Sequence, residues 1–189
     1  MKLPPFLLLT AFCITHSLCA DKENYTIDPT HSSVAFSIRH FVAKTTGNFN
    51  QFEGSIFVDT DDMTKNRVEA SIRVASIDTA DAKRDAHLNA DDYFNSAEHP
   101  GILFKSQKWE TTDQKDTFMV TGDLTMLGHS RTVQLKVVVL GFGPGRNGAY
   151  LSGWEATARI SRSEWGLTAG TPAIGDEVDI TINIEAIRQ

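Results

Sequence analysis

The sequence predicts an all-β fold, an antiparallel β-barrel of eight or nine strands with one helical insertion. First, apolar side chains alternate with polar ones in successive segments, as in 68–74, 133–139 and 178–184. A period of two places the apolar residues on one face of a strand. Second, turn residues separate these segments at short intervals, so sequential antiparallel neighbours are expected. Closure into a barrel buries several apolar faces without leaving open strand edges.

The first 20 residues have the character of a signal peptide rather than part of the fold. Lys2 precedes an apolar stretch at 6–14, and small residues follow it at 17–20. This stretch is too short to span a bilayer, and the pattern predicts cleavage after Ala20, with cleavage after Cys19 as the alternative. We therefore expect a signal peptide at 1–20 and one exported domain at 21–189. Both cysteines lie in the leader, so the domain must rely on its core.

The first half of the mature chain predicts four strands and then a helix. The strands are expected at 25–27, 34–42, 52–58 and 68–76, with a polar turn at 59–62. Between Asp78 and Asn95 the period changes, and alanine, leucine and aromatic residues stand among charges. This change favours a helix, which His99 and Pro100 end.

The second half predicts five further strands. They are expected at 102–109, 117–126, 132–142, 149–160 and 177–188. Turns between them are indicated at Asp113, at Gly128, at 143–145 and at Gly175-Asp176.

Composition narrows the function classes. The formal net charge is −6, and removing Lys2 with the leader changes it to −7. Basic clusters are absent from the sequence, which argues against nucleic acid and against tight adhesion to anionic lipid surfaces. Beyond the leader no apolar run is long enough for a membrane-spanning helix.

Motifs for catalysis are weak in this sequence. The GPGRNG string at 143–148 precedes an expected strand instead of a helix, so a glycine-rich hairpin is favoured over nucleotide binding. Ser130, beside His129, lacks the glycine of a nucleophile elbow two residues later, which favours a polar turn. Asp28, His31 and Ser32 invite a triad interpretation, but an Asp-Pro turn whose side chains cap the backbone is favoured.

Metal ligation is not expected from spacing. The histidines of the mature chain are His31, His40, His87, His99 and His129. None of them forms a pair with cysteine at metal-ligand spacing, and the H-E-x-x-H motif is absent, so a site assembled in three dimensions is the remaining alternative.

The helical insertion has two interpretations that are compatible. In one, Arg84 and Asp85 tie the helix to the barrel rim. In the other, Leu88, Tyr93 and Phe94 form a lid over one end of the bore.

Several segments resemble the YceI-like family of exported, lipocalin-like proteins. They are YTIDPTHS at 25–32, VAF at 34–36, His40, GNF at 47–49, FEG at 52–54, SIDT at 76–79, RDAHL at 84–88, GDLTMLG at 122–128 and ISRSEWGL at 160–167. The resemblance implies an extended eight-stranded antiparallel barrel whose amphipathic pore holds a polyisoprenoid, an isoprenoid-quinone-like lipid or a similar long-chain amphiphile. It also implies a periplasmic location, no catalysis and frequent homodimers. Trp165 departs from the family, which more often has Phe there.

The residues expected to line the pore and bind the lipid lie on one face of each expected strand. They are Phe36, Ile38, Ile72, Val74, Phe104, Val120, Leu124, Leu135, Val137, Ala158, Ile160 and Ile182. Small residues of the same parity, Ala70 and Gly122, are expected to leave room along the bore. For any one of these positions an ordinary core role is the alternative.

Energetics favour reversible exchange of such a lipid. An isoprene unit leaving water gains roughly 3–4 kcal/mol at ~0.8 kcal/mol per methylene, whereas association costs on the order of 4–15 kcal/mol. A chain drawn from a membrane is already dry, so its transfer is nearly neutral. The rival hypotheses are a lipid-modifying enzyme using His31, Asp28, Arg84 or Arg162, and a solidly packed stress-response barrel without ligand.

Overall fold

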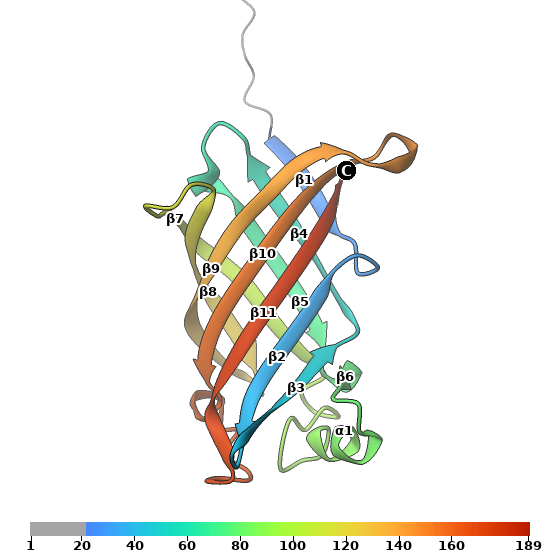
Figure 1. The fold of residues 1–189 in the computed structure, drawn as a ribbon, viewed down its shortest axis with the longest axis vertical. Coiled ribbons are helices and arrows are strands. Elements are labelled where there is room, and N and C mark those ends of the chain that lie inside the picture. The colour runs from blue at the N-terminus through green and yellow to red at the C-terminus, as the bar shows by residue number, and fades with distance from the viewer. Residues whose placement is uncertain (1–21) are drawn as a thin grey trace, which may run out of the picture.

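Eight strands form a closed antiparallel ring in the computed structural model, which describes residues 22–189. The expected signal peptide at 1–20 lies outside the described residues. The ring consists of β1 (Lys22–Ile27), β4 (Phe52–Asp59), β5 (Arg67–Arg73), β7 (Gly101–Thr111), β8 (Thr117–Met126), β9 (His129–Pro144), β10 (Tyr150–Ser161) and β11 (Ile174–Arg188). Pairing of β1 with β11 closes it. The predicted fold class, an eight-stranded antiparallel barrel, is confirmed (Figure 1).

Three further strands lengthen the barrel wall at the end where α1 (Ala82–Leu88) lies (Figure 1). They are β2 (Ser33–His40), β3 (Ala43–Phe49) and β6 (Ile77–Asp78). β1 and β2 both pair with β11, where Ile27 faces Ala186 and Ser33 faces Asn183. The five residues between the two strands, 28–32, therefore stand opposite two residues of β11, 184 and 185. This break in the wall positions one of the side-chain clusters described below.

Short 3₁₀ turns connect the strands at four points. They are η1 (Met63–Lys65), η2 (Val74–Ser76), η3 (Arg146–Gly148) and η4 (Arg162–Trp165).

The strand expected to run on to Val42 ends at His40, and the chain turns back into β3. Phe41 adopts a left-handed conformation (φ 49°) at this turn. Its backbone is held from both sides, because its N–H donates to the Ala173 carbonyl and its carbonyl accepts from Arg39. β3 was not predicted, because its sequence AKTTGNF lacks an apolar alternation.

The helical insertion is shorter than the predicted 78–95. α1 spans one helix of seven residues, Ala82–Leu88, and Asp81 caps its N-terminus by accepting from the N–H groups of Lys83 and Arg84. The rest of the segment consists of turns. Tyr93 and Phe94, which the pattern places on a helix, lie in these turns and still face the cavity.

The turn predicted at Gly175-Asp176 is wrong. These residues lie inside β11, where the pairing with β2 shifts between Ile174 and Val178, as at a β-bulge. The connection from β10 to β11 instead runs through η4 and a loop that includes Pro172.

Two groups of buried side chains form the core. One gathers around β1 and includes Tyr25, Val58, Val120 and Trp154. The other gathers around β6 and includes Ile77 and Trp165, the latter donating its indole N–H to the Leu124 carbonyl at 3.1 Å. Trp165 is thus fixed in this core group by a hydrogen bond to the backbone of β8. Within residues 22–189 no helix has the length and apolar character needed to cross a membrane.

Candidate ligand-binding site in the barrel

The barrel encloses a cavity of about 510 Å³ whose wall is mostly aliphatic and aromatic. Binding sites for small ligands commonly measure roughly 300–1,000 Å³, so the volume is of that kind. Inward-facing residues of nearly every strand contribute to the wall. The predicted apolar bore is therefore hollow.

Eleven of the twelve residues predicted to bind the lipid line this cavity. They are Phe36, Ile38, Ile72, Phe104, Val120, Leu124, Leu135, Val137, Ala158, Ile160 and Ile182. Their placement on the wall follows from strand parity, whereas a role in lipid binding stays a prediction.

Val74 is the exception, because β5 ends at Arg73 and the chain enters the 3₁₀ turn η2. The strict alternation of a strand stops there. Val74 is 1% exposed and packs in the core group around β6 instead of lining the cavity. Its N–H donates to the Pro100 carbonyl at 2.9 Å, which fixes the turn.

Small residues on the wall account for part of the cavity volume, but only one of the two small residues expected there, Ala70, lines the cavity. Ala70, Ala156 and Ala158 line the cavity. Gly122 does not, because the Phe104 ring occupies its space, and a Cβ added to Gly122 would lie 2.6 Å from that ring. The expectation that Gly122 leaves room along the bore is therefore wrong.

Polar groups of the wall come mainly from the end of the barrel where α1 lies (Figure 1). The polar lining residues are His40, Thr45, Glu53, Thr79, Arg84, His87 and Arg162. All but Glu53 belong to, or directly adjoin, β2, β3, β6, α1 and η4. The bore is thus amphipathic, with a polar end near α1 and a mostly apolar remainder.

Arg162 is the buried member of this polar end, with 5% of its surface exposed. Its Nε donates to the Gly175 carbonyl at 2.8 Å, and Nη2 lies 3.3 Å from the Ile174 carbonyl and 3.4 Å from Thr171 Oγ1. These acceptors are all uncharged, and no carboxylate in the described part of the chain partners the guanidinium. A buried positive charge without a counter-charge is costly.

α1 is fastened to the barrel through Thr79. Arg84 donates to the hydroxyl and the carbonyl of Thr79, each at 2.7 Å, and Asp85 accepts from the N–H and hydroxyl of the same residue. Leu88, Tyr93 and Phe94 all line the cavity. Both interpretations of the insertion hold, because the segment is tied to the rim and also covers the bore.

A polar network surrounds Tyr25, which is fully buried on β1. Its hydroxyl donates to Glu23, and Arg188 donates to the other oxygen of Glu23 at 2.6 Å. Burial alone raises the pKa of Glu23, but the bonds from Tyr25 and Arg188 outweigh it and hold that pKa below its ordinary value. Burial and the bond to Glu23 raise the pKa of Tyr25.

Of the weak catalytic motifs, the glycine string forms a hairpin connection, as predicted, whereas the polar turn expected at His129 and Ser130 is wrong, because the turn lies before them, at Leu127 and Gly128. The glycine string at 143–148 forms the connection between β9 and β10, with η3 at its tip. His129 and Ser130 begin β9 directly after the Leu127–Gly128 turn, and the Ser130 Oγ accepts from Thr125 Oγ1 at 3.1 Å.

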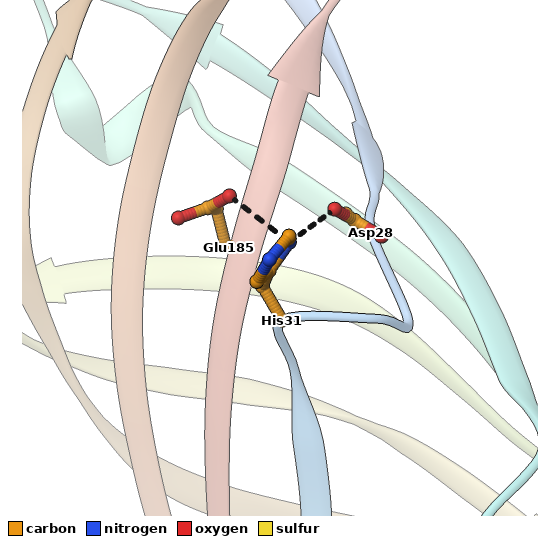
Figure 2. Close-up of side chains that lie close together, drawn as sticks. All are labelled: Asp28, His31 and Glu185. Atoms are coloured by element: carbon orange, nitrogen blue, oxygen red, sulfur yellow. Dashed lines mark hydrogen bonds and ion pairs between the residues drawn. The ribbon is translucent and has the colours of Figure 1, made fainter. Parts of the chain in front are cut away.

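Asp28, His31 and Glu185 meet at the break between β1 and β2, and none of them lines the cavity (Figure 2). Asp28 Oδ1 accepts from the Thr30 N–H at 2.9 Å, so the predicted capped turn is confirmed. The Ser32 hydroxyl is committed to the backbone of Glu185, accepting from its N–H and donating to its carbonyl. A Ser-His-Asp triad is therefore not assembled.

Hydrogen bonds and charges within this cluster shift the pKa values of His31 and Asp28. Asp28 Oδ2 lies 2.8 Å from His31 Nδ1, and Glu185 Oε1 lies 3.6 Å from the same nitrogen. The bond to Asp28, followed by the charges of Asp28 and Glu185, raises the pKa of His31, and Arg146 opposes them. The bond to His31 and that from the Thr30 N–H lower the pKa of Asp28.

Comparison with known proteins relates the whole described domain to one family. Residues 25–186 match the YceI-like domain. A UPF0312 protein of Photorhabdus laumondii is 34% identical over 169 residues, which cover 88% of this chain and 87% of that protein.

Solved structures with the same architecture include BcnA of Burkholderia cenocepacia, at a TM-score of 0.74 and 25% identity, covering 84% of this chain and 98% of that one. A polyisoprenoid binding domain from Saccharophagus degradans superposes at a TM-score of 0.67, covering 87% of this chain and 98% of that one. At 16% identity this second likeness concerns the fold alone.

Proposed function

This chain belongs to the YceI-like family, and we propose that it is an exported carrier for a polyisoprenoid or other long-chain amphiphilic lipid. The observation that carries the proposal is the apolar cavity of about 510 Å³ with its polar groups gathered at one end. The tail lies among the aliphatic residues of the bore. The head group lies at the end where α1 covers it.

Arg162 indicates the kind of head group. An arginine stays charged at any ordinary pH, and its burial without a carboxylate leaves a positive charge uncompensated. An anionic head, or one with strong acceptor oxygens, supplies the missing partner. Arg84, at the same end, donates through Nε and Nη2 to Thr79 and forms no ion pair within residues 22–189, so it adds a second positive group.

A binding role is favoured over an enzymatic one by the placement of the polar residues. His31 and Asp28, two of the candidate catalytic residues, lie outside the cavity. They form hydrogen bonds within the turn between β1 and β2. The arginines of the bore are hydrogen-bond donors that hold their charge, which suits recognition more than proton transfer. A solidly packed barrel is disfavoured by the cavity itself.

The location in the proposal is the periplasm, reached through cleavage of a signal peptide at 1–20. The leader pattern of the sequence supports it. There the protein exchanges its lipid with membranes, because a chain leaving a bilayer gains little by entering an equally dry bore. The carrier is thus loaded and unloaded reversibly.

Quenching of tryptophan fluorescence tests the proposal, because Trp109 and Trp154 line the cavity. The probes are a long-chain phosphate monoester brominated along its tail and the alcohol of the same tail. Both are expected to quench saturably, and the phosphate is expected to bind about tenfold or more tightly, a difference of ~1.4 kcal/mol. Arg162→Gln is expected to remove that preference while quenching persists. Absence of saturable quenching by either probe contradicts a lipid-binding bore.

A further inference from the structure

The wall break between β1 and β2 carries side chains that the lipid site does not use. We propose that Asp28, His31 and Glu185 bind a divalent transition-metal ion, with Zn²⁺ as the fitting example, on the outer wall of the barrel. Figure 2 shows His31 between the two carboxylates, Asp28 from the turn after β1 and Glu185 from β11. The proposal is independent of lipid binding.

The distances suit a shared ion. One ligand atom from each of the three residues lies within 4.8 Å of the others. His31 Nδ1 is 2.8 Å from Asp28 Oδ2 and 3.6 Å from Glu185 Oε1. Two ligand atoms that share a tetrahedral zinc ion at about 2.1 Å each lie about 3.4 Å apart, so small rotations of these side chains complete the site.

Hydrogen bonds to the backbone already hold both segments of the cluster in place. The Asp28 N–H donates to the Glu185 carbonyl at 2.9 Å, and the Ser32 hydroxyl accepts from the Glu185 N–H at 3.0 Å. The Thr30 N–H occupies Asp28 Oδ1, which leaves Oδ2 directed at His31. Such outer contacts orient ligands in known metal sites and raise affinity.

The donor set selects the class of ion. One imidazole nitrogen and two carboxylate oxygens match sites with three protein ligands, which leave a position open to water. Imidazole favours zinc and its first-row neighbours over Mg²⁺ and Ca²⁺, which prefer oxygen alone. The His31 side chain is 64% exposed, so an ion has free access.

Another pair in the protein provides a matched control. His87 Nε2 lies 3.0 Å from Asp92 Oδ2, and the His87 side chain is exposed to a similar extent as that of His31. In residues 22–189 no group of three metal-ligating side chains other than Asp28, His31 and Glu185 converges this closely. His87 therefore has one carboxylate partner where His31 has two.

Isothermal titration of the untagged protein with Zn²⁺ tests the site. We expect saturable binding of one ion, lost in His31→Asn, about tenfold or more weaker in Asp28→Asn and Glu185→Gln, and unchanged in His87→Asn. Circular dichroism and Tm of each variant verify that the fold persists. Absence of saturable binding to the unaltered protein, or binding that survives His31→Asn, overturns the proposal.

The pH dependence supplies a second readout. Zinc must displace the proton from His31 Nδ1, so affinity is expected to fall as pH drops through the pKa of His31. Asp28 and Glu185 raise that pKa and Arg146 opposes them. Zinc affinity that is unchanged through this range contradicts ligation by His31. Stripping the lipid from the bore is expected to leave zinc affinity unchanged, so this test and that of the lipid carrier succeed or fail separately.

Discussion

The replacement Ala158→Leu reports whether the bore is truly unfilled, because its sign depends on free space. Ala158 lies on β10 opposite Ile180 and lines the cavity. Leucine adds three carbons, worth ~2.4 kcal/mol at ~0.8 kcal/mol each. The loss of leucine rotamer freedom costs ~0.5–1 kcal/mol. We therefore expect the lipid-free protein to gain roughly 1.5 kcal/mol of unfolding free energy.

The same substitution at Ala186 is the matched control. Ala186 also faces inward on a neighbouring strand, but it is 0% exposed and packs with Tyr25 and Trp154. Leucine there overfills the core and is expected to cost ~1–3 kcal/mol. The two variants thus move stability in opposite directions.

Denaturant and thermal unfolding of lipid-free protein measure both effects. A gain of ~1.5 kcal/mol corresponds to a Tm rise of ~3–6 °C in a domain of this size. The added carbons of Ala158→Leu occupy space that the tail uses, so affinity for a long-chain probe is expected to fall about tenfold or more. If Ala158→Leu destabilises as much as Ala186→Leu, the cavity is filled in solution and the reasoning is refuted.

Further predictions concern packing and titration. Gly122→Ala is expected to lower stability by ~1–3 kcal/mol, because its Cβ would lie 2.6 Å from a backbone oxygen of β7; Gly143→Ala, with nothing within 4 Å, is the neutral control in denaturant unfolding. In NMR titration the pKa of His31 is expected above its ordinary value and to fall in Asp28→Asn. A raised folded-state pKa means that this contribution to stability is complete below the unfolded pKa of about 6.5 and is lost as pH rises through the folded pKa. Absorbance titration is expected to show Tyr25 ionising well above its ordinary pKa, and titration at the ordinary value contradicts the buried bond to Glu23.

The barrel was predictable from sequence because most of its strands alternate apolar and polar side chains with a period of two residues. On β8, for example, Val120 and Leu124 lie on the same face of a regular strand and line the cavity as predicted. The parity argument failed where the backbone stops being a strand. Val74 is apolar and in phase, yet η2 turns it into the core. A 3₁₀ turn of three residues leaves no sequence period of its own.

Residues that make the bore amphipathic were less accessible to sequence reasoning. β3 contributes Thr45 and Phe49 to the wall, but its polar sequence gives no strand pattern. Arg162 was a candidate only as a polar residue of unknown direction. Its burial depends on the carbonyls of Ile174 and Gly175 at the start of β11, which no local pattern specifies.

Glu185 illustrates a contact that sequence alone cannot supply. Asp28 and His31 are neighbours in the chain, whereas Glu185 reaches them only through the register of β11 against β1 and β2. That register follows from barrel closure. The sequence therefore indicates only two members of the cluster, Asp28 and His31, and the structure adds the third.

Mass spectrometry of organic extracts from the purified protein tests the central claim most directly. The account predicts a long-chain amphiphile in repeated preparations of the unaltered protein and a marked loss of it from Ala158→Leu. Repeated preparations that contain no long-chain species, from protein whose fold is verified, contradict the account.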